Sequence, residues 1–357
     1  MKLRRLLGTV FVVGLIAYGW KASGDLRPFV KIDPVGVQNC RVVQTEGLIG
    51  AEDMEFDHQT ATLYIAASNR RKSGNFRPDP GAIFRWQPDK EPAPVRMDVQ
   101  GNDDALRPHG IGLYRHPGGE RRLFVVNHTS RGETVSIFRI ETANGIEKLA
   151  TIREVRAPQF VSINDVAPSG LESFYVTNDH GRPPVLGHIW EDFAMLSRGS
   201  LVYFDGTSAQ TVVSGLRYAN GVTLSADRKL LTVAETTAYR IKFFHHADDG
   251  KLQLVSERSI DTTPDNFSQD ERGEFLIGAH PSPYQFIRYA ASASDPSPSE
   301  VLSMHVTPDG SSQTFSTVLR APGEVFGASS VAAAHGPHLV VGGVFDRGVL
   351  YCAKPAS

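Results

Sequence analysis

The chain contains 357 residues, of which 41% are hydrophobic and 21% are charged, a composition typical of a globular protein. Its 37 lysines and arginines against 39 aspartates and glutamates leave a formal net charge of −2. Because that charge provides no basic field for holding phosphates, we expect no nucleic-acid partner.

Residues 1–22 are predicted to direct export. Basic residues among the first five positions precede an apolar run over residues 6–20, which Lys21 ends. This order is typical of a secretory leader, although the run is shorter than the ~20 residues of a spanning helix and the candidate cleavage sites are imperfect. We therefore expect a periplasmic or extracellular protein whose leader is either cleaved or retained as a membrane anchor, with membrane or lipid contact through this segment.

Residues 23–357 are predicted to form one all-β domain. The pattern that repeats there is a polar residue ahead of a short apolar run, then a turn, then another strand. Six such openings occur, at Glu52, His109, Asn164, Asn220, Asp265 and Ser329, and they are 57, 55, 56, 45 and 64 residues apart. This spacing predicts a six-bladed β-propeller around a central channel.

Several segments interrupt or follow the repeated strands. Residues 68–80 are basic and broken by glycine and proline, so we expect a loop over one face of the ring. Residues 188–197 have helical spacing inside blade three and are predicted to form a surface helix. We expect blade five over residues 265–289 and a Ser/Pro-rich linker over residues 290–300.

The two cysteines lie at opposite ends of the region predicted to fold. Cys40 precedes the first blade and Cys352 belongs to the last strand. Because the two ends of a propeller ring meet and an exported protein can oxidise its thiols, we expect a disulfide between them. The alternative is a pair of unpaired, buried thiols.

Oxygen-bearing side chains cluster at the strand openings of different blades. Inner strands of a propeller open toward its axis, so these side chains are expected to converge although they are far apart in the sequence. Four of the seven are carboxylates, which cannot be buried together without a cation, and such oxygen ligands favour calcium. The alternative is turn chemistry, since Asn and Asp are common before strands. The seven residues are Glu52, Asp53, Asn164, Asp165, Asn220, Asp265 and Asn266.

Two histidines, His109 and His128, belong to adjacent predicted strands near the same axis. A histidine beside a metal-bound carbonyl is suited to activating water, because its reference pKa lies near neutral pH. The alternative for each is a structural role. The sequence contains no G-x-S-x-G, H-E-x-x-H, P-loop or complete EF-hand motif, so no motif supports a serine nucleophile.

Nine short motifs in order resemble the paraoxonase family of calcium-dependent lactonases and arylesterases, whose members are six-bladed propellers. They extend over nearly the whole predicted folded region. The motifs are GAEDME at 50–55, RPHGIG at 107–112, VVNHTS at 125–130, INDV at 163–166, TNDH at 177–180, YANGV at 218–222, PDNFS at 264–268, GAHP at 278–281 and VLYC at 349–352.

The resemblance implies two calcium ions and a set of site residues. The catalytic ion would be held by Glu52, Asn164, Asn220, Asp265 and Asn266. A second, structural ion would be held by Asp53, Asp165 and the backbone carbonyl of Ile111. His109 and His128 match the family's proposed catalytic dyad, Asp179 and His280 would line the pocket, and Cys40 would pair with Cys352.

We therefore expect a calcium-dependent hydrolase of lactones and aryl esters, in which calcium polarises the carbonyl and His109, assisted by His128, activates water. The alternatives are a single-metal sugar lactonase of the gluconolactonase type and a non-enzymatic, calcium-stabilised binding propeller. The chain departs from the family at Ala279, in the segment with Asp346 and Arg347, and in the loop at 68–80. Since these positions shape the pocket, the preferred lactone does not follow from the resemblance.

Overall fold

The structure is a computed structural model that describes residues 24–71, 79–101, 104–182, 188, 191, 195–247 and 249–353. The predicted leader and half of the residues of the helix expected at 188–197 lie outside these residues. No helix within the described residues is long and apolar enough to cross a membrane.

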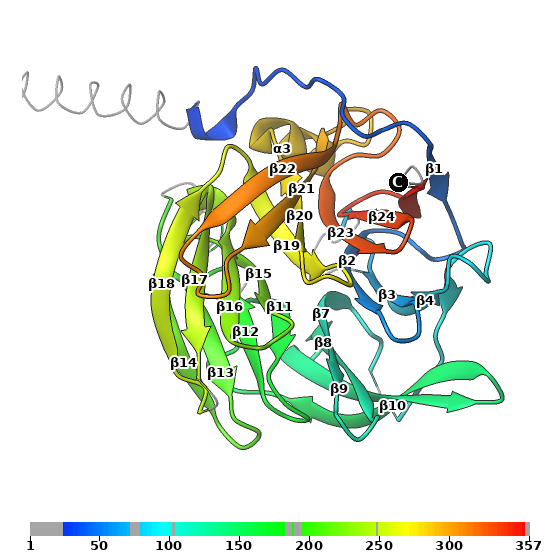
Figure 1. Cartoon of the computed structure of the whole chain (residues 1–357), viewed down its shortest axis with the longest axis vertical. Helices are drawn as coiled ribbons and strands as arrows, with labels where there is room; N and C mark the ends of the chain where they lie inside the picture. Colours follow the sequence, from blue (N-terminus) through cyan, green and yellow to red (C-terminus); the bar gives the residue numbers. More distant parts are fainter. Residues whose placement is uncertain are drawn as a thin grey trace, which may run out of the picture.

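Six sheets, antiparallel except for one strand pair in blade two, are arranged as blades around a central axis, as Figure 1 shows. From the axis outward, blade one contains β2 (Ala51–Asp57), β3 (Thr62–Ala67), β4 (Ala82–Trp86) and β5 (Val95–Arg96). Blade two contains β7 (Pro108–Arg115), β8 (Arg121–Thr129), β9 (Gly132–Ala143), β10 (Ile146–Val155) and β6 (Val99–Gln100), and its β10–β6 pair is parallel. Blade three contains β11 (Ile163–Pro168), β12 (Phe174–Asn178), β13 (Gly199–Phe204) and β14 (Ala209–Leu216).

Blades four to six follow the same plan. Blade four contains β15 (Ala219–Leu224), β16 (Leu230–Glu235), β17 (Arg240–His246) and β18 (Leu252–Ser259), with the 3-10 turn η1 (Thr236–Ala238) between β16 and β17. Blade five contains β19 (Thr263–Gln269), β20 (Phe275–His280), β21 (Ser299–Val306) and β22 (Gln313–Ala321), with the helix α3 (Pro283–Ala291) between β20 and β21. Blade six contains β23 (Ser329–His335), β24 (His338–Gly343), β25 (Val349–Ala353) and β1 (Cys40–Val43). The prediction of six blades is confirmed, and every predicted opening lies in an innermost strand.

The apolar core lies between neighbouring blades. Residues of blades two and three share one cluster, in which the rings of Phe124, Phe174 and Phe204 meet with centroids 5.2 to 5.8 Å apart. All six residues of β3 are buried, because both faces of its sheet are covered by other blades. Each blade therefore depends on its neighbours for burial, which explains why the ring must close.

The ring closes where the two ends of the chain meet. β1 pairs antiparallel with β25, so the N-terminal strand becomes the outermost strand of blade six. Cys40 lies opposite Cys352 in this pairing, and the two form a disulfide. The predicted bridge is confirmed.

The predicted extent of blade five was wrong. Residues 283–289 form most of α3 instead of continuing the sheet, and the blade resumes with β21 and ends with β22. The helix begins there because Ser282 accepts a hydrogen bond from the backbone N–H of Gln285 and Pro283 occupies its first turn. Its Tyr289 is buried, so α3 packs against the rest of the domain through this side chain.

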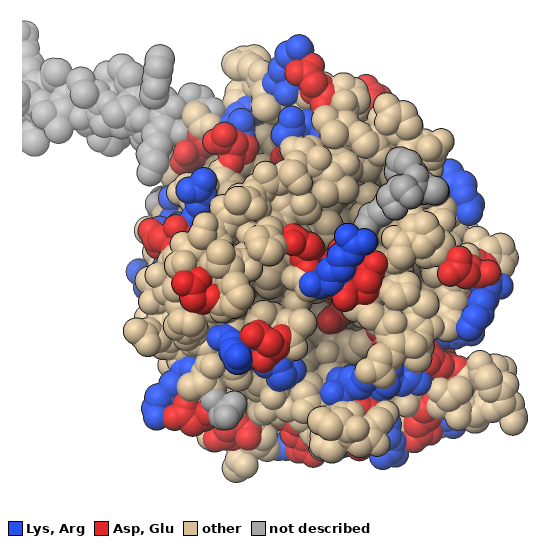
Figure 2. All heavy atoms as spheres, in the orientation of Figure 1, with Lys and Arg blue, Asp and Glu red and all other residues tan. Residues whose placement is uncertain are grey.

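Charged side chains of both signs are interspersed over the face shown in Figure 2. Near the middle of that face, acidic and basic groups lie next to one another around a depression. The surface in this view therefore carries no extended field of one sign.

Candidate metal and catalytic site

The innermost strands share a local irregularity at the end where the polar residues lie. Each has a register shift in its pairing with the next strand, between 51 and 53, 108 and 111, 163 and 166, 219 and 222, 264 and 267, and 329 and 331. In a regular strand, successive side chains point to opposite faces, whereas a bulge releases residues from that alternation. The irregularity explains how consecutive residues such as Glu52 and Asp53 both contribute to the axis.

Glycines let the bulged backbones approach one another. A Cβ atom at Gly110 would lie 2.3 Å from Oδ1 of Asp165 and 2.4 Å from its Cα, and one at Gly221 would lie 2.4 Å from the carbonyl oxygen of Asp265. Neither position accommodates a side chain without movement of the neighbouring strand. The glycines of the PHGI and ANGV motifs thus set the spacing of the inner strands.

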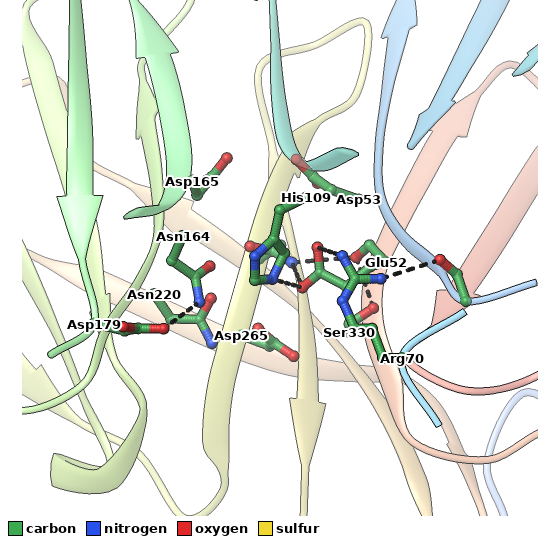
Figure 3. Close-up of polar contacts among 12 residues, drawn as sticks. Glu52, Asp53, Arg70, His109, Asn164, Asp165, Asp179, Asn220, Asp265 and Ser330 are labelled. Atoms are coloured by element: carbon green, nitrogen blue, oxygen red, sulfur yellow. Dashed lines mark hydrogen bonds and ion pairs between the residues drawn. The ribbon is translucent and has the colours of Figure 1, made fainter. Parts of the chain in front are cut away.

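Five buried side-chain oxygens belong to these strand openings. Figure 3 labels Glu52, Asn164, Asn220 and Asp265, whose side chains lie around one central space. Among the described residues, each of the five lacks a hydrogen-bond donor, although buried polar atoms are normally satisfied. An oxygen without a donor but with free lone pairs suits a cation. The five are Oε2 of Glu52, Oδ1 of Asn164, Oδ1 of Asn220, Oδ1 of Asp265 and Oδ1 of Asn266, the same residues expected to hold the catalytic calcium.

Neighbouring acceptors orient the three amides of this set. Asn164 donates its Nδ2 to Asp179 at 3.3 Å, Asn220 donates to the Thr236 hydroxyl at 3.1 Å, and Asn266 donates to Oε1 of Glu52 at 2.9 Å. With its nitrogen held in this way, each amide presents its oxygen to the centre. Such supporting contacts are typical of metal ligands.

Electrostatics support the presence of a cation. Burial opposes ionisation of Glu52, but nearby His109 and Arg70 together with a hydrogen bond from Asn266 lower its pKa to about 2. Burial raises the pKa of Asp265, against the hydrogen bond from His280 Nε2 at 2.8 Å. A bound cation would compensate the buried charge of both carboxylates.

Asp53 and Asp165 lie on one side of this group in Figure 3. Oδ1 and Oδ2 of Asp53 accept from the backbone N–H groups of Met54 and Ile111 at 2.8 and 2.6 Å, and Asp165 accepts from Val166 and Val222, both at 2.7 Å. Burial raises the pKa of both carboxyl groups, and the charge of Asp165 raises that of Asp53 further. Ile111 and Asp165 also line a cavity of about 60 Å³.

His109 and His128 form a direct contact, as expected, and a third residue extends it. Nδ1 of His109 lies 2.9 Å from Nε2 of His128, whose Nδ1 lies 2.7 Å from Oε2 of Glu133. Because a carboxylate only accepts, Nδ1 of His128 carries a hydrogen. When both rings are neutral, Nε2 of His128 therefore accepts from Nδ1 of His109, and the remaining lone pair lies on Nε2 of His109. That nitrogen lies 3.4 Å from Oε1 of Glu52, beside the five oxygens.

Two contributors were missed in the sequence. Glu133 lies five residues beyond His128, across the β8–β9 turn, and the pairing of His128 with Glu133 in that hairpin was the signal that could have found it. Arg70 comes from the loop after β3, donates to the carbonyl of Pro108 at 3.1 Å and lies 3.8 Å from Oε2 of Glu52. No periodicity points to an irregular segment, so only the structure places this guanidinium.

The two remaining predicted residues have different surroundings, polar for Asp179 and aromatic for His280. Asp179 lies 2.8 Å from Nδ1 of His180 and also accepts from Ser162 and Asn164. Burial raises its pKa, but His180, followed by Ser162 and Asn164, lowers it to about 2. The ring of His280 lies 4.4 Å from that of Phe286 on α3, which in turn lies 5.4 Å from Phe345. The Arg71 guanidinium covers Phe345 at 4.7 Å.

Known proteins are similar in sequence to this chain over almost its entire length. The family model described as Arylesterase matches residues 31–354. Serum paraoxonase/arylesterase 1 of Mus musculus is 32% identical over 337 residues, which cover 92% of each chain. Serum paraoxonase/lactonase 3 of Homo sapiens is 30% identical over 329 residues, 90% of each chain. The chain belongs to the arylesterase family.

Membership in the arylesterase family makes the protein an ester hydrolase and excludes a purely non-enzymatic propeller. A solved gluconolactonase from Xanthomonas campestris has a similar structure, with a TM-score of 0.53 over 92% of this chain and 99% of its own. Its sequence identity is 17%, so the likeness shows a shared propeller fold. The alternative of a gluconolactonase-type enzyme is thus less well supported than the arylesterase assignment.

Proposed function

We propose that this member of the arylesterase family is a calcium-dependent hydrolase of lactones and aryl esters. The observation that carries the proposal is the set of five buried oxygens without donors beside Nε2 of His109. Glu52, Asn164, Asn220, Asp265 and Asn266 would hold the catalytic ion. When bound, calcium supplies a positive charge that polarises the substrate carbonyl and stabilises the oxyanion.

The second proposed ion would be held by Asp53, Asp165 and the backbone carbonyl of Ile111. The support is the burial of two carboxylates whose mutual repulsion raises the pKa of Asp53. Each carboxylate oxygen that accepts one N–H bond retains a lone pair for a cation. Because the two aspartates come from blades one and three, this ion would join strands on either side of β7 and thereby stabilise the channel.

His109 is the proposed base. Its Nε2 would take a proton from water as the water oxygen attacks the ester carbonyl, which gives a tetrahedral oxyanion and an imidazolium. The contact through Nδ1 of His109 to His128 and on to Glu133 would stabilise that positive charge. As the carbon–oxygen bond to the leaving group breaks, the proton on Nε2 would pass to the departing oxygen.

The surroundings of the site suit aryl and cyclic substrates. Phe286, Phe345 and His280 form a continuous ring surface next to Asp265, against which a planar leaving group or a lactone ring would pack. Arg70 would hold the Glu52 carboxylate ionised while the substrate carbonyl approaches.

We also propose that the protein is exported. Support comes from the basic and apolar order of residues 1–22 and from the Cys40–Cys352 disulfide, which is typical of an oxidising compartment. Cell fractionation of the full chain tests this: the oxidised protein is expected outside the cytoplasm, and a reduced, wholly cytoplasmic protein would contradict it.

A substrate panel tests the proposed reaction. Purified protein is assayed with phenyl acetate, an aliphatic δ-lactone and a sugar lactone, each with and without a calcium chelator. Hydrolysis of the first two, abolished by the chelator, is the expected result. Preferential hydrolysis of the sugar lactone would instead support a gluconolactonase-type enzyme, and chelator-resistant turnover would contradict the metal-dependent step.

A further inference from the structure

A second cluster of ligand-type side chains lies at the opposite end of the inner strands. His58 directly follows β2, Glu271 belongs to the β19–β20 turn, and His335 is the last residue of β23. Glu52 lies near the start of β2, so His58 is six residues away, about 20 Å along an extended strand. The cluster therefore belongs to the other mouth of the channel and is separate from the esterase site.

The two imidazoles face each other at close range. Nδ1 of His58 lies 3.0 Å from Nδ1 of His335, and one ligand atom from each of His58, His335 and Glu271 lies within 4.8 Å of the others. The rings are nearly parallel, with centroids 5.3 Å apart, and Phe56 packs against both at 6.1 and 5.6 Å. This packing fixes the ring orientations before any ligand binds.

A backbone contact defines which nitrogen of His58 has a lone pair. Nε2 of His58 lies 2.9 Å from the carbonyl oxygen of Gln269. A carbonyl only accepts, so Nε2 carries the hydrogen and Nδ1 of the neutral ring presents its lone pair toward His335. A ring nitrogen that donates to a backbone carbonyl while the other faces a ligand is the usual arrangement of a metal-bound histidine.

We propose that Nδ1 of His58, Nδ1 of His335 and the carboxylate of Glu271 bind a zinc-class divalent ion. Two imidazoles and one carboxylate suit zinc, which takes nitrogen ligands, whereas calcium is held by oxygen ligands, so the two mouths of the channel select different ions.

The ion would link three blades at the seam where the ring closes. His58 belongs to blade one, Glu271 to blade five and His335 to blade six, and the Cys40–Cys352 disulfide joins the outer edge of that last blade. A bond between inner strands would complement the outer bridge, because the two act at opposite sides of the same sheet. Binding to the folded chain alone would raise its thermal stability.

Zinc titration of calcium-saturated protein without a polyhistidine tag tests the proposal. Competition with a chromophoric chelator is measured for the parent, His335→Ala, Glu271→Gln and, as a matched control, His305→Ala, which removes an exposed histidine paired with Glu274. The parent and His305→Ala should bind one zinc ion with equal affinity and gain thermal stability. His335→Ala should lose the ion, and Glu271→Gln should bind it about tenfold or more weakly.

Two outcomes would overturn the zinc site. One is a parent protein that binds no zinc at a saturable site, which would leave the two rings joined by a hydrogen bond from Nδ1 of His335. The other is equal affinity and stoichiometry in all four proteins, which would place the ion elsewhere. Glu271 is exposed, so Glu271→Gln is expected to fold and to give a clear result even where His335→Ala is unstable.

Discussion

The chemistry of the site depends on which atoms are left without a hydrogen. In the neutral histidine pair, Nε2 of His109 has a lone pair because Glu133 accepts from His128, which in turn accepts from Nδ1 of His109. In the same way, Asn220 presents its oxygen because Thr236 accepts from its nitrogen. Glu133 and Thr236, which contact the functional residues from outside the site, thus determine which atoms of those residues face the metal site as acceptors.

His109→Gln and Glu133→Gln separate these roles. His109→Gln keeps a polar group of similar size but removes the base, so kcat for phenyl acetate should fall about a hundredfold or more while calcium affinity stays near that of the parent. Glu133→Gln removes only the charge that stabilises the imidazolium, so a smaller loss of kcat is expected. Steady-state kinetics with His305→Gln as control measures both, and parental rates in His109→Gln would assign the base to another group.

Asn220→Ala should weaken calcium binding and hydrolysis together, because it deletes one of the five ligand oxygens, and excess calcium should partly restore activity. Thr236→Val keeps that oxygen but removes the acceptor that orients it, so its calcium affinity should lie between those of the parent and Asn220→Ala. Calcium titration of the three proteins checks this order. Parental affinity in Asn220→Ala would exclude Asn220 as a ligand.

Among the elements, the innermost strands show what a repeat can and cannot predict. The blade-length spacing of Glu52, His109, Asn164 and the later openings predicted the strand ends that surround the axis, since a repeated pattern requires only local sequence. The register shifts were not predicted, because they depend on pairing between strands. Glu133 and Arg70 could be assigned only from the folded structure, since Glu133 contacts the site across a turn and Arg70 from an irregular segment. The helix α3 was not predicted, because the Ser/Pro-rich sequence that follows it indicated a linker.

Gly110→Ala tests the close approach of β7 and β11. The added methyl group would meet Oδ1 and Cα of Asp165, so the strands must separate, and a loss of about 1 to 3 kcal/mol in the free energy of unfolding is expected. Gly24→Ala is the control, because among the described residues no atom lies within 4 Å of its added Cβ. Denaturant unfolding measures both, and equal stability of the two variants would show that β7 and β11 accommodate the added methyl group without separating.

For the whole molecule, closure of the ring joins residues that are 312 positions apart. Cross-linking so long a loop restricts the unfolded chain, by about 5 kcal/mol in the chain-entropy model and commonly by 2 to 5 kcal/mol in practice. The double variant Cys40→Ser, Cys352→Ser should therefore unfold at a lower temperature than the oxidised parent and match the parent after reduction. An unchanged melting temperature would mean that the β1–β25 pairing alone closes the ring.

Calcium binding depends on single residues, on the strands and on the whole ring, since the closed ring positions the bulged inner strands and these strands position the five oxygens around the axis. The most direct test measures bound calcium and phenyl acetate hydrolysis on the same samples as calcium is returned to metal-depleted protein. The account predicts two calcium ions per chain, activity that rises with occupancy of the site containing Asn220, and no recovery with magnesium. Full activity in protein free of metal, or two bound calcium ions in an Asn220→Ala variant with parental affinity, would contradict it.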